Sequence, residues 1–269
     1  MAVATRTLTD RLGAPAALLM MGWLSVVLWL DRADGGGSIW VQRCLGLLTW
    51  CVLLVALSRV SPTVRAQTAV VVAFATVVEV VFSATLHVYE YRFDNVPAYV
   101  PPGHGLVYLS AFALGHAAFV RRPWSLRAGA TRRPDGMRVA EVLVLAAGAG
   151  WAAYGLFVAD RPDALGAFWY LCLVGFLLWG PSKPVYVGAF VVVSWLELLG
   201  TGLGTWVWGA HDFTGRVTIG NPPSGAAGGY GWFDLAGLLL APYLVRRFTR
   251  SAREPVPEPS RTAPDAGVR

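Results

Sequence analysis

The sequence alternates between long apolar runs and short segments that hold most of its charged residues. A helix rises about 1.5 Å per residue, so a run of about 20 residues crosses a hydrocarbon core of about 30 Å. The runs that fit this pattern cover residues 14–30, 39–58, 67–88, 104–120, 138–158, 164–180, 184–208 and 229–245. The pattern predicts an all-α fold, a polytopic transmembrane helical bundle of about eight spans.

The same pattern divides the chain into two regions. Residues 1–247 are predicted to form one transmembrane domain. Residues 248–269 are rich in Pro, Arg and Glu, which predicts a disordered cytoplasmic tail. The first apolar run follows Arg6 and Arg11 as a signal peptide would, but no small-residue cleavage site follows it. We therefore expect it to be an uncleaved span.

Composition agrees with a membrane protein and argues against nucleic-acid binding. Of the 269 residues, 55% are hydrophobic and 14% are charged, whereas soluble domains usually carry about 25% charged residues. The net charge of +6 comes from basic residues concentrated in alternate loops, where the positive-inside rule places them. Three cysteines are too few for a disulfide framework. The expected partners are membrane lipids, with no nucleic acid.

The distribution of basic residues predicts the orientation. If the N-terminus is cytoplasmic, 17 of the 22 Lys and Arg residues lie in cytoplasmic segments. The positive-inside rule then predicts that both termini are cytoplasmic and that the number of spans is even. Nearly all basic residues are arginine, and Ala, Val and Gly are abundant, as in GC-rich bacterial genomes. The predicted location is the bacterial inner (plasma) membrane.

Corresponding features recur in the two halves of the chain. Glu79 and Glu197 lie 118 residues apart, and each is followed by an aromatic pair and then by two consecutive prolines. These features are Tyr89, Tyr91, Pro101 and Pro102 in the first half, and Trp206, Trp208, Pro222 and Pro223 in the second. The offsets predict an internal repeat with halves 14–120 and 138–245. With four spans per half the repeat is parallel; chance similarity of two aromatic-ended helices is the alternative.

Three acidic residues are candidate catalytic groups. Glu79 and Glu197 lie deep inside predicted spans, where a charge costs at least about 2.5–3.5 kcal/mol. We expect both to face the bundle interior as acid/base groups, with Asp234 as a further catalytic carboxyl group. A protonated Glu that merely bonds to a neighbouring helix is the alternative, although Ser, Thr or Asn usually fill that role.

Histidines near the same segments are candidate metal ligands. His87 follows Glu79 by about two helical turns, and His104 opens the next span. Together with Glu79 and Glu197 they predict a divalent-metal site of the His/carboxylate type. The spacing matches no established ligand motif, so histidines that bond to the loop backbone are the alternative.

Aromatic, amide and guanidinium groups near the outer helix ends form the predicted substrate-binding set. The set comprises Arg92, Tyr91, Asn221, Trp206 and Trp208. The Pro-Pro turns are expected to fix the backbone just before two spans, whose N-termini could hold an anionic group. Anchoring at the membrane interface would explain the aromatic residues almost as well.

One stretch resembles a known family. The segment from Glu197 to Pro223 is similar to carotenoid hydratases of bacterial membranes, but it does not reproduce their motif cleanly, and we do not assign the chain to that family. The HExxH, P-loop and CxxC motifs do not occur in the sequence.

These features predict a membrane-embedded enzyme that acts on a lipid-like or lipid-linked substrate at a site opening to the outer face. Glu79 and Glu197 would act as acid/base or metal-ligand groups, and His87 and His104 as ligands or proton carriers. The first alternative is a proton-coupled transporter, which should also carry polar residues in the cytoplasmic halves of its spans. The second is a membrane scaffold or assembly subunit, which needs no paired buried carboxyl groups.

Overall fold

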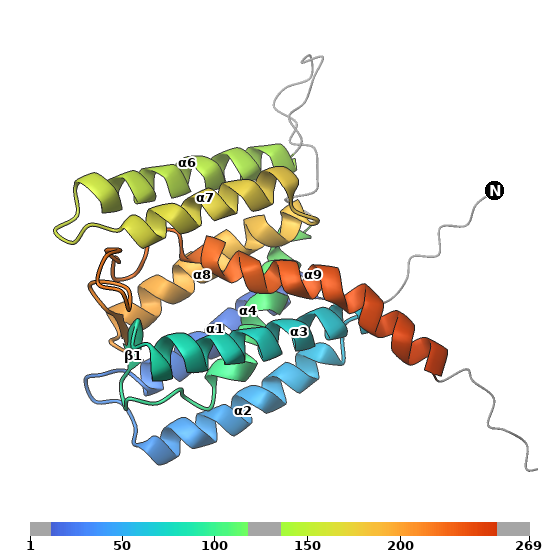
Figure 1. Cartoon of the computed structure of the whole chain (residues 1–269). Helices are drawn as coiled ribbons and strands as arrows, with labels where there is room; N and C mark the ends of the chain where they lie inside the picture. Colours follow the sequence, from blue (N-terminus) through green and yellow to red (C-terminus); the bar gives the residue numbers. More distant parts are fainter. Residues whose placement is uncertain (1–11, 118–135, 252–269) are drawn as a thin grey trace, which may run out of the picture.

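The computed structural model describes residues 12–117 and 136–251 (Figure 1). The α-helices in these residues are α1 (Ala14–Leu30), α2 (Ile39–Leu57), α3 (Pro62–Glu79), α4 (Val100–Gly115), α6 (Gly136–Phe157), α7 (Ala164–Trp179), α8 (Lys183–Gly202) and α9 (Ala226–Ser251). A π-helix, η1 (Val80–Thr85), continues α3. The short strands β1 (Tyr89–Tyr91) and β2 (Trp206–Trp208) pair in antiparallel fashion. The fold is therefore mostly helical, as predicted.

Within residues 12–117 and 136–251, four helical segments are long and apolar enough to cross a membrane. They are Ile39–Leu57, Pro62–Thr85, Gly136–Phe157 and Lys183–Gly202. The helices Ala14–Leu30 and Ala164–Trp179 are apolar but shorter. Large apolar side chains such as Phe157 and Trp179 lie fully on the outside of the bundle, an arrangement that suits lipid better than water. These features indicate a membrane protein.

Helix α4 lies at the centre of the bundle. Of its 16 residues, 13 are buried, and it packs against α1, α2, α3 and α8. Helices α3 and α9 pack against each other and lie towards the viewer in Figure 1. Helices α6 and α7 lie at one edge of the bundle, and α2 lies at the opposite edge. Most side chains of α4, together with the buried side chains of α3, α8 and α9, therefore form the interior of the protein.

Small residues allow the central helices to approach closely. A Cβ atom at Gly188 of α8 would lie 2.0 Å from the carbonyl oxygen of Ala111 in α4. A Cβ atom at Gly228 of α9 would lie 1.8 Å from the carbonyl oxygen of Trp169 in α7. Neither space can hold a side chain, so glycine is required at both crossings. Such contacts between small residues are typical of helix packing in membranes.

The observed helices differ from the predicted spans mainly at their ends. The span predicted at 67–88 begins at Pro62, where Ser61 caps the helix, and it ends as η1. The span predicted at 184–208 ends at Gly202, and its last aromatic residues form β2 instead. The period of a helix and that of a short strand are hard to distinguish in an apolar run.

Two predicted turns are also shifted, because α4 and α9 begin earlier than expected. Helix α4 starts at Val100, so Pro101 and Pro102 lie inside its first turn, where proline is well tolerated. Helix α9 starts at Ala226 and continues to Ser251, so residues 248–251 are helical rather than part of a disordered tail. The rest of the predicted tail, residues 252–269, and the basic loop within 118–135 lie outside the described residues.

Candidate active site

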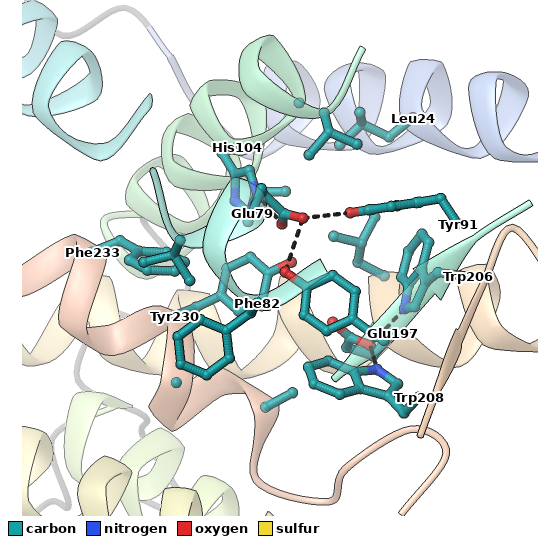
Figure 2. Close-up of a pocket in the computed structure, with 18 of the residues that line it drawn as sticks. Leu24, Glu79, Phe82, Tyr91, His104, Glu197, Trp206, Trp208, Tyr230 and Phe233 are labelled. Carbon is teal, nitrogen blue, oxygen red and sulfur yellow. Dashed lines mark hydrogen bonds and ion pairs between the residues drawn. The ribbon is translucent and has the colours of Figure 1, made fainter. Parts of the chain in front are cut away.

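A cavity of about 240 Å³ lies among the central helices, at the end of the bundle that carries the two-stranded sheet. Its walls are mainly aliphatic and aromatic, and Glu79, His104 and Glu197 are its ionisable residues apart from tyrosines. Figure 2 shows these three side chains with the aromatic residues that surround them. The predicted groups Tyr91, Trp206 and Trp208 also line this cavity. The structure thus brings together residues from both halves of the chain.

Glu79 receives three hydrogen-bonding groups, although its side chain is almost fully buried. The hydroxyls of Tyr89 and Tyr91 both donate to its Oε2 atom, each at 2.9 Å. The Nε2 atom of His104 lies 2.9 Å from Oε1. Burial and the neighbouring Glu79 raise the pKa of both tyrosine hydroxyls, so they stay protonated as donors. This set of partners suits a carboxylate, alone or paired with a charged histidine.

Glu197 is also buried but has fewer partners. The indole N–H groups of Trp206 and Trp208 donate to its Oε2 atom at 3.1 and 3.0 Å. Its Oε1 atom has no hydrogen-bond partner among the described residues, and Glu197 lines the cavity. Two neutral donors compensate a buried charge poorly, so the neutral acid is the less costly form here. In that form Glu197 carries a proton that can face a bound molecule.

The two-stranded sheet covers the cavity and places the four aromatic donors. Tyr89 pairs with Trp208, and Tyr91 pairs with Trp206. In each strand the outer two side chains are buried and the central one, Glu90 or Val207, is exposed. Successive side chains of a strand point to opposite faces, so the first and third residues of each strand, which are aromatic, share one face. The sheet therefore covers this end of the cavity with its aromatic face.

The partners of Glu79 and Glu197 correspond to each other across this sheet. Each glutamate lies on the helix before its strand, and each accepts hydrogen bonds from both aromatic residues of that strand at one carboxyl oxygen. Antiparallel pairing relates the two strands by a local two-fold axis. Only Glu79 has an additional histidine, which comes from α4. The two carboxyl groups are therefore similar in position but differ in their hydrogen-bond partners.

Arg92, which is predicted to bind substrate, fastens the loop after α1. Its guanidinium donates to the carbonyl oxygens of Arg32 and Gly37 and lies 3.5 Å from Asp31. Asp31 also accepts hydrogen bonds from Gln42 and Tyr99, at 2.9 and 2.7 Å. Burial and this carboxylate raise the pKa of the Tyr99 hydroxyl. Arg92 does not line the cavity, so its position is that of a structural clamp.

Asn221, the other predicted polar contact to the substrate, holds β2. Its Oδ1 atom accepts a hydrogen bond from the backbone N–H of Trp208 at 3.0 Å. Asp163 fixes the same loop, because its carboxylate accepts hydrogen bonds from the N–H groups of Gly166, Gly220 and Ser224. Asn221 is therefore linked to the cavity through the backbone of Trp208.

Two of the predicted catalytic residues lie away from the cavity. His87 is half-exposed, and its Nδ1 atom lies 3.8 Å from Glu90. Asp234 is buried on α9, one turn beyond Tyr230, but does not line the cavity. Within residues 12–117 and 136–251, no group of three or more His, Cys, Asp or Glu residues is placed to hold a metal ion. The predicted ligand set of His87, His104, Glu79 and Glu197 is therefore not assembled in these residues.

Sequence reasoning identified Tyr89 as part of an aromatic pair but left it out of the substrate-binding set, and it missed Tyr230 as a lining residue and Asp163 and Asp31 as loop anchors. Tyr89 carried a usable signal, because its spacing from Glu79 resembles that of Trp206 from Glu197. Tyr230 and the anchors gave none, since their roles depend on contacts between distant segments.

No protein-family model matches the chain, and no curated protein or solved structure matches it significantly.

Proposed function

We propose that this protein is a membrane-embedded enzyme that acts on a lipid-like substrate by acid–base chemistry. The observation that carries the proposal is a pair of buried carboxyl groups that border one cavity with different hydrogen-bond partners. Carboxyl pairs whose environments favour opposite protonation states are typical of acid/base sites. The apolar and aromatic walls favour a hydrophobic substrate over a polar one.

Each carboxyl group has a distinct role in this proposal. Glu197 donates the proton of its neutral acid from Oε1 to the substrate, and its conjugate base is then stabilised by the indoles of Trp206 and Trp208. Glu79 with His104 accepts a proton or stabilises positive charge that develops on the substrate. The two tyrosines hold Glu79 in place.

The finer architecture is part of the proposal. We place eight spans in the bacterial inner membrane with both termini cytoplasmic, supported by the distribution of arginine. A parallel repeat of two four-helix halves is supported by the matched glutamates and the antiparallel pairing of their strands. The packing of α3 against α9 also corresponds to that of α8 against α4, as the repeat requires. The site then forms between the halves.

The test replaces each glutamate by its amide. In a cell-based complementation assay, Glu79→Gln and Glu197→Gln should each abolish function while the protein is still produced and runs as a single species in detergent. Leu198→Gln, one position away on the exposed surface of α8, is the control for adding a glutamine. Full complementation by both glutamate variants would reject the proposal.

One observation favours the transporter as the second candidate. Asp234 is buried without a hydrogen-bond partner among the described residues, and it lies close enough to Tyr108 and Tyr186 to interact electrostatically. Tyr186 lies near the start of α8, at the end opposite Glu197. Buried polar groups thus extend along the bundle beyond the cavity, as a proton route would require. Proton uptake coupled to a solute in vesicles, lost in Asp234→Asn, would favour this candidate.

A further inference from the structure

The cavity has a side opening, which its lining residues reveal. Those contributed by α1, α4, α8 and the two strands are buried. The partly exposed lining residues all belong to the α3–η1 segment, α7 or α9: Phe74, Val78, Phe82, Trp169, Gly229, Tyr230, Trp232 and Phe233. The cavity therefore reaches the surface between these helices, and we call this place the side portal.

The side portal faces the part of the surface that is covered by apolar side chains. Phe74 is 40% exposed and Trp232 is 48% exposed, and both also line the cavity. Neighbouring residues of α3, such as Val77, are exposed and apolar as well. The outer end is closed by the aromatic face of the sheet. A molecule in the lipid can thus reach the cavity along an apolar route, whereas the two-stranded sheet blocks a molecule that approaches from the water.

Local backbone and ring contacts shape the portal. The π-helix η1 lies on one side of it and places Phe82 in the cavity wall, as Figure 2 shows. Such irregular helical turns occur frequently at functional sites. On the inner side, Phe74 and Phe233 pack edge to face at 5.4 Å between ring centres and join α3 to α9. The portal is therefore bounded inward by this pair and outward by the sheet.

The size of the cavity indicates what enters. Sites for whole drug-sized ligands usually measure about 300–1,000 Å³, and this cavity is about 240 Å³. It has room for a section of a linear chain but not for a chain together with a head group. The remainder of such a molecule would stay in the bilayer, outside the portal.

We infer that the hydrocarbon chain of a membrane lipid enters sideways through the side portal and places one section of its length between Glu79 and Glu197. This inference rests on the proposed function and specifies its substrate class and route. It requires that the reacting group lie along the chain or at its apolar end, since the head group remains outside.

The test uses a fatty acid with a photoreactive diazirine in mid-chain, added to vesicles that contain the full chain. After illumination, mass spectrometry should find label on cavity residues, including Glu79 or Glu197, because alkyl diazirines react readily with carboxyl groups. Val78→Trp, which narrows the portal, should lower cavity labelling several-fold. Val77→Trp, at the adjacent exposed position outside the cavity, should leave cavity labelling unchanged. Neither variant should change the labelling of α2.

Two outcomes would overturn the inference. One is labelling confined to outward-facing residues, and the other is cavity labelling that Val78→Trp does not reduce. Either result leaves the proposed enzyme intact if Glu79→Gln and Glu197→Gln still abolish function, because the substrate would then reach the site by another route. Normal cavity labelling together with fully functional glutamate variants would instead reject the enzyme and keep a lipid-binding site.

Discussion

The ring of Tyr89 packs against the indole of Trp208 with 4.5 Å between ring centres, and each then donates a hydrogen bond to a different buried glutamate. This contact joins the two halves of the chain directly above the cavity. A shift of either strand would therefore disturb Glu79 and Glu197 together. The two carboxyl groups are held as one unit, although they lie on separate helices.

Removal of the tyrosine hydroxyls should destabilise the protein. Tyr89→Phe and Tyr91→Phe each delete one hydrogen bond to Glu79, and bonds to a charged group contribute about 1.5–3 kcal/mol. Because both hydroxyls donate to the same oxygen, the loss in the double variant should differ from the sum of the single losses. Unfolding in detergent, followed for the single and double variants, measures this. Strict additivity would mean that the two hydroxyls act independently.

Substitutions of Glu197 should separate function from stability. In Glu197→Gln the amide oxygen can still accept from Trp206 and Trp208, so the free energy of unfolding should change by less than about 1 kcal/mol. In Glu197→Ala two buried indole N–H groups lose their acceptor, at a cost of about 1–3 kcal/mol each. Function should be lost in both variants. A stable and active glutamine variant would show that Glu197 is only a structural acceptor.

Arg92 should matter for folding and not for substrate binding. Arg92→Ala removes the bonds to the carbonyl oxygens of Arg32 and Gly37 and leaves Asp31 without its cation, so unfolding should occur at lower temperature. The folded fraction should keep its apparent substrate affinity. Arg216→Ala, on the exposed loop beyond β2, is the matched control. A stable Arg92 variant with weakened substrate binding would show that Arg92 binds substrate, as the sequence predicts.

The extent to which the sequence predicted this molecule depends on whether each signal was local. The helices were predicted from the apolar runs, because this prediction uses only neighbouring residues and the thickness of the hydrocarbon core. Glu79, Glu197 and the aromatic pairs were found because charged groups are costly in apolar runs and because their spacing recurs. The pairing of Tyr89 with Trp208 could not be predicted, since strands of three residues have almost no periodicity. The contacts of Arg92 with the loop after α1 could not be predicted, because a buried clamp and a substrate contact use the same side chain.

The metal hypothesis has a direct test. A metal site at Glu79 and His104 would need further ligands, and His87 lies outside the cavity next to Glu90. We therefore expect much less than one equivalent of zinc, iron or manganese in protein purified without chelators. His87→Ala should leave both metal content and function unchanged, whereas His104→Ala should impair function through Glu79. One equivalent of metal that is lost in His104→Ala would turn the proposal towards metal-assisted chemistry.

Two buried aspartates provide the last comparison, because one is fully bonded and the other is not. Asp163 accepts three backbone hydrogen bonds, so in Asp163→Asn the amide nitrogen would face an N–H donor, at a cost of about 1–3 kcal/mol. Asp234 accepts none among the described residues, and Asp234→Asn should leave stability unchanged or raise it. Unfolding of both variants in detergent measures the difference. If the protein is an enzyme, the Asp234→Asn variant should also restore function in the complementation assay. Loss of function in a stable Asp234 variant would mean that this carboxyl group carries protons, and the transporter would become the leading candidate.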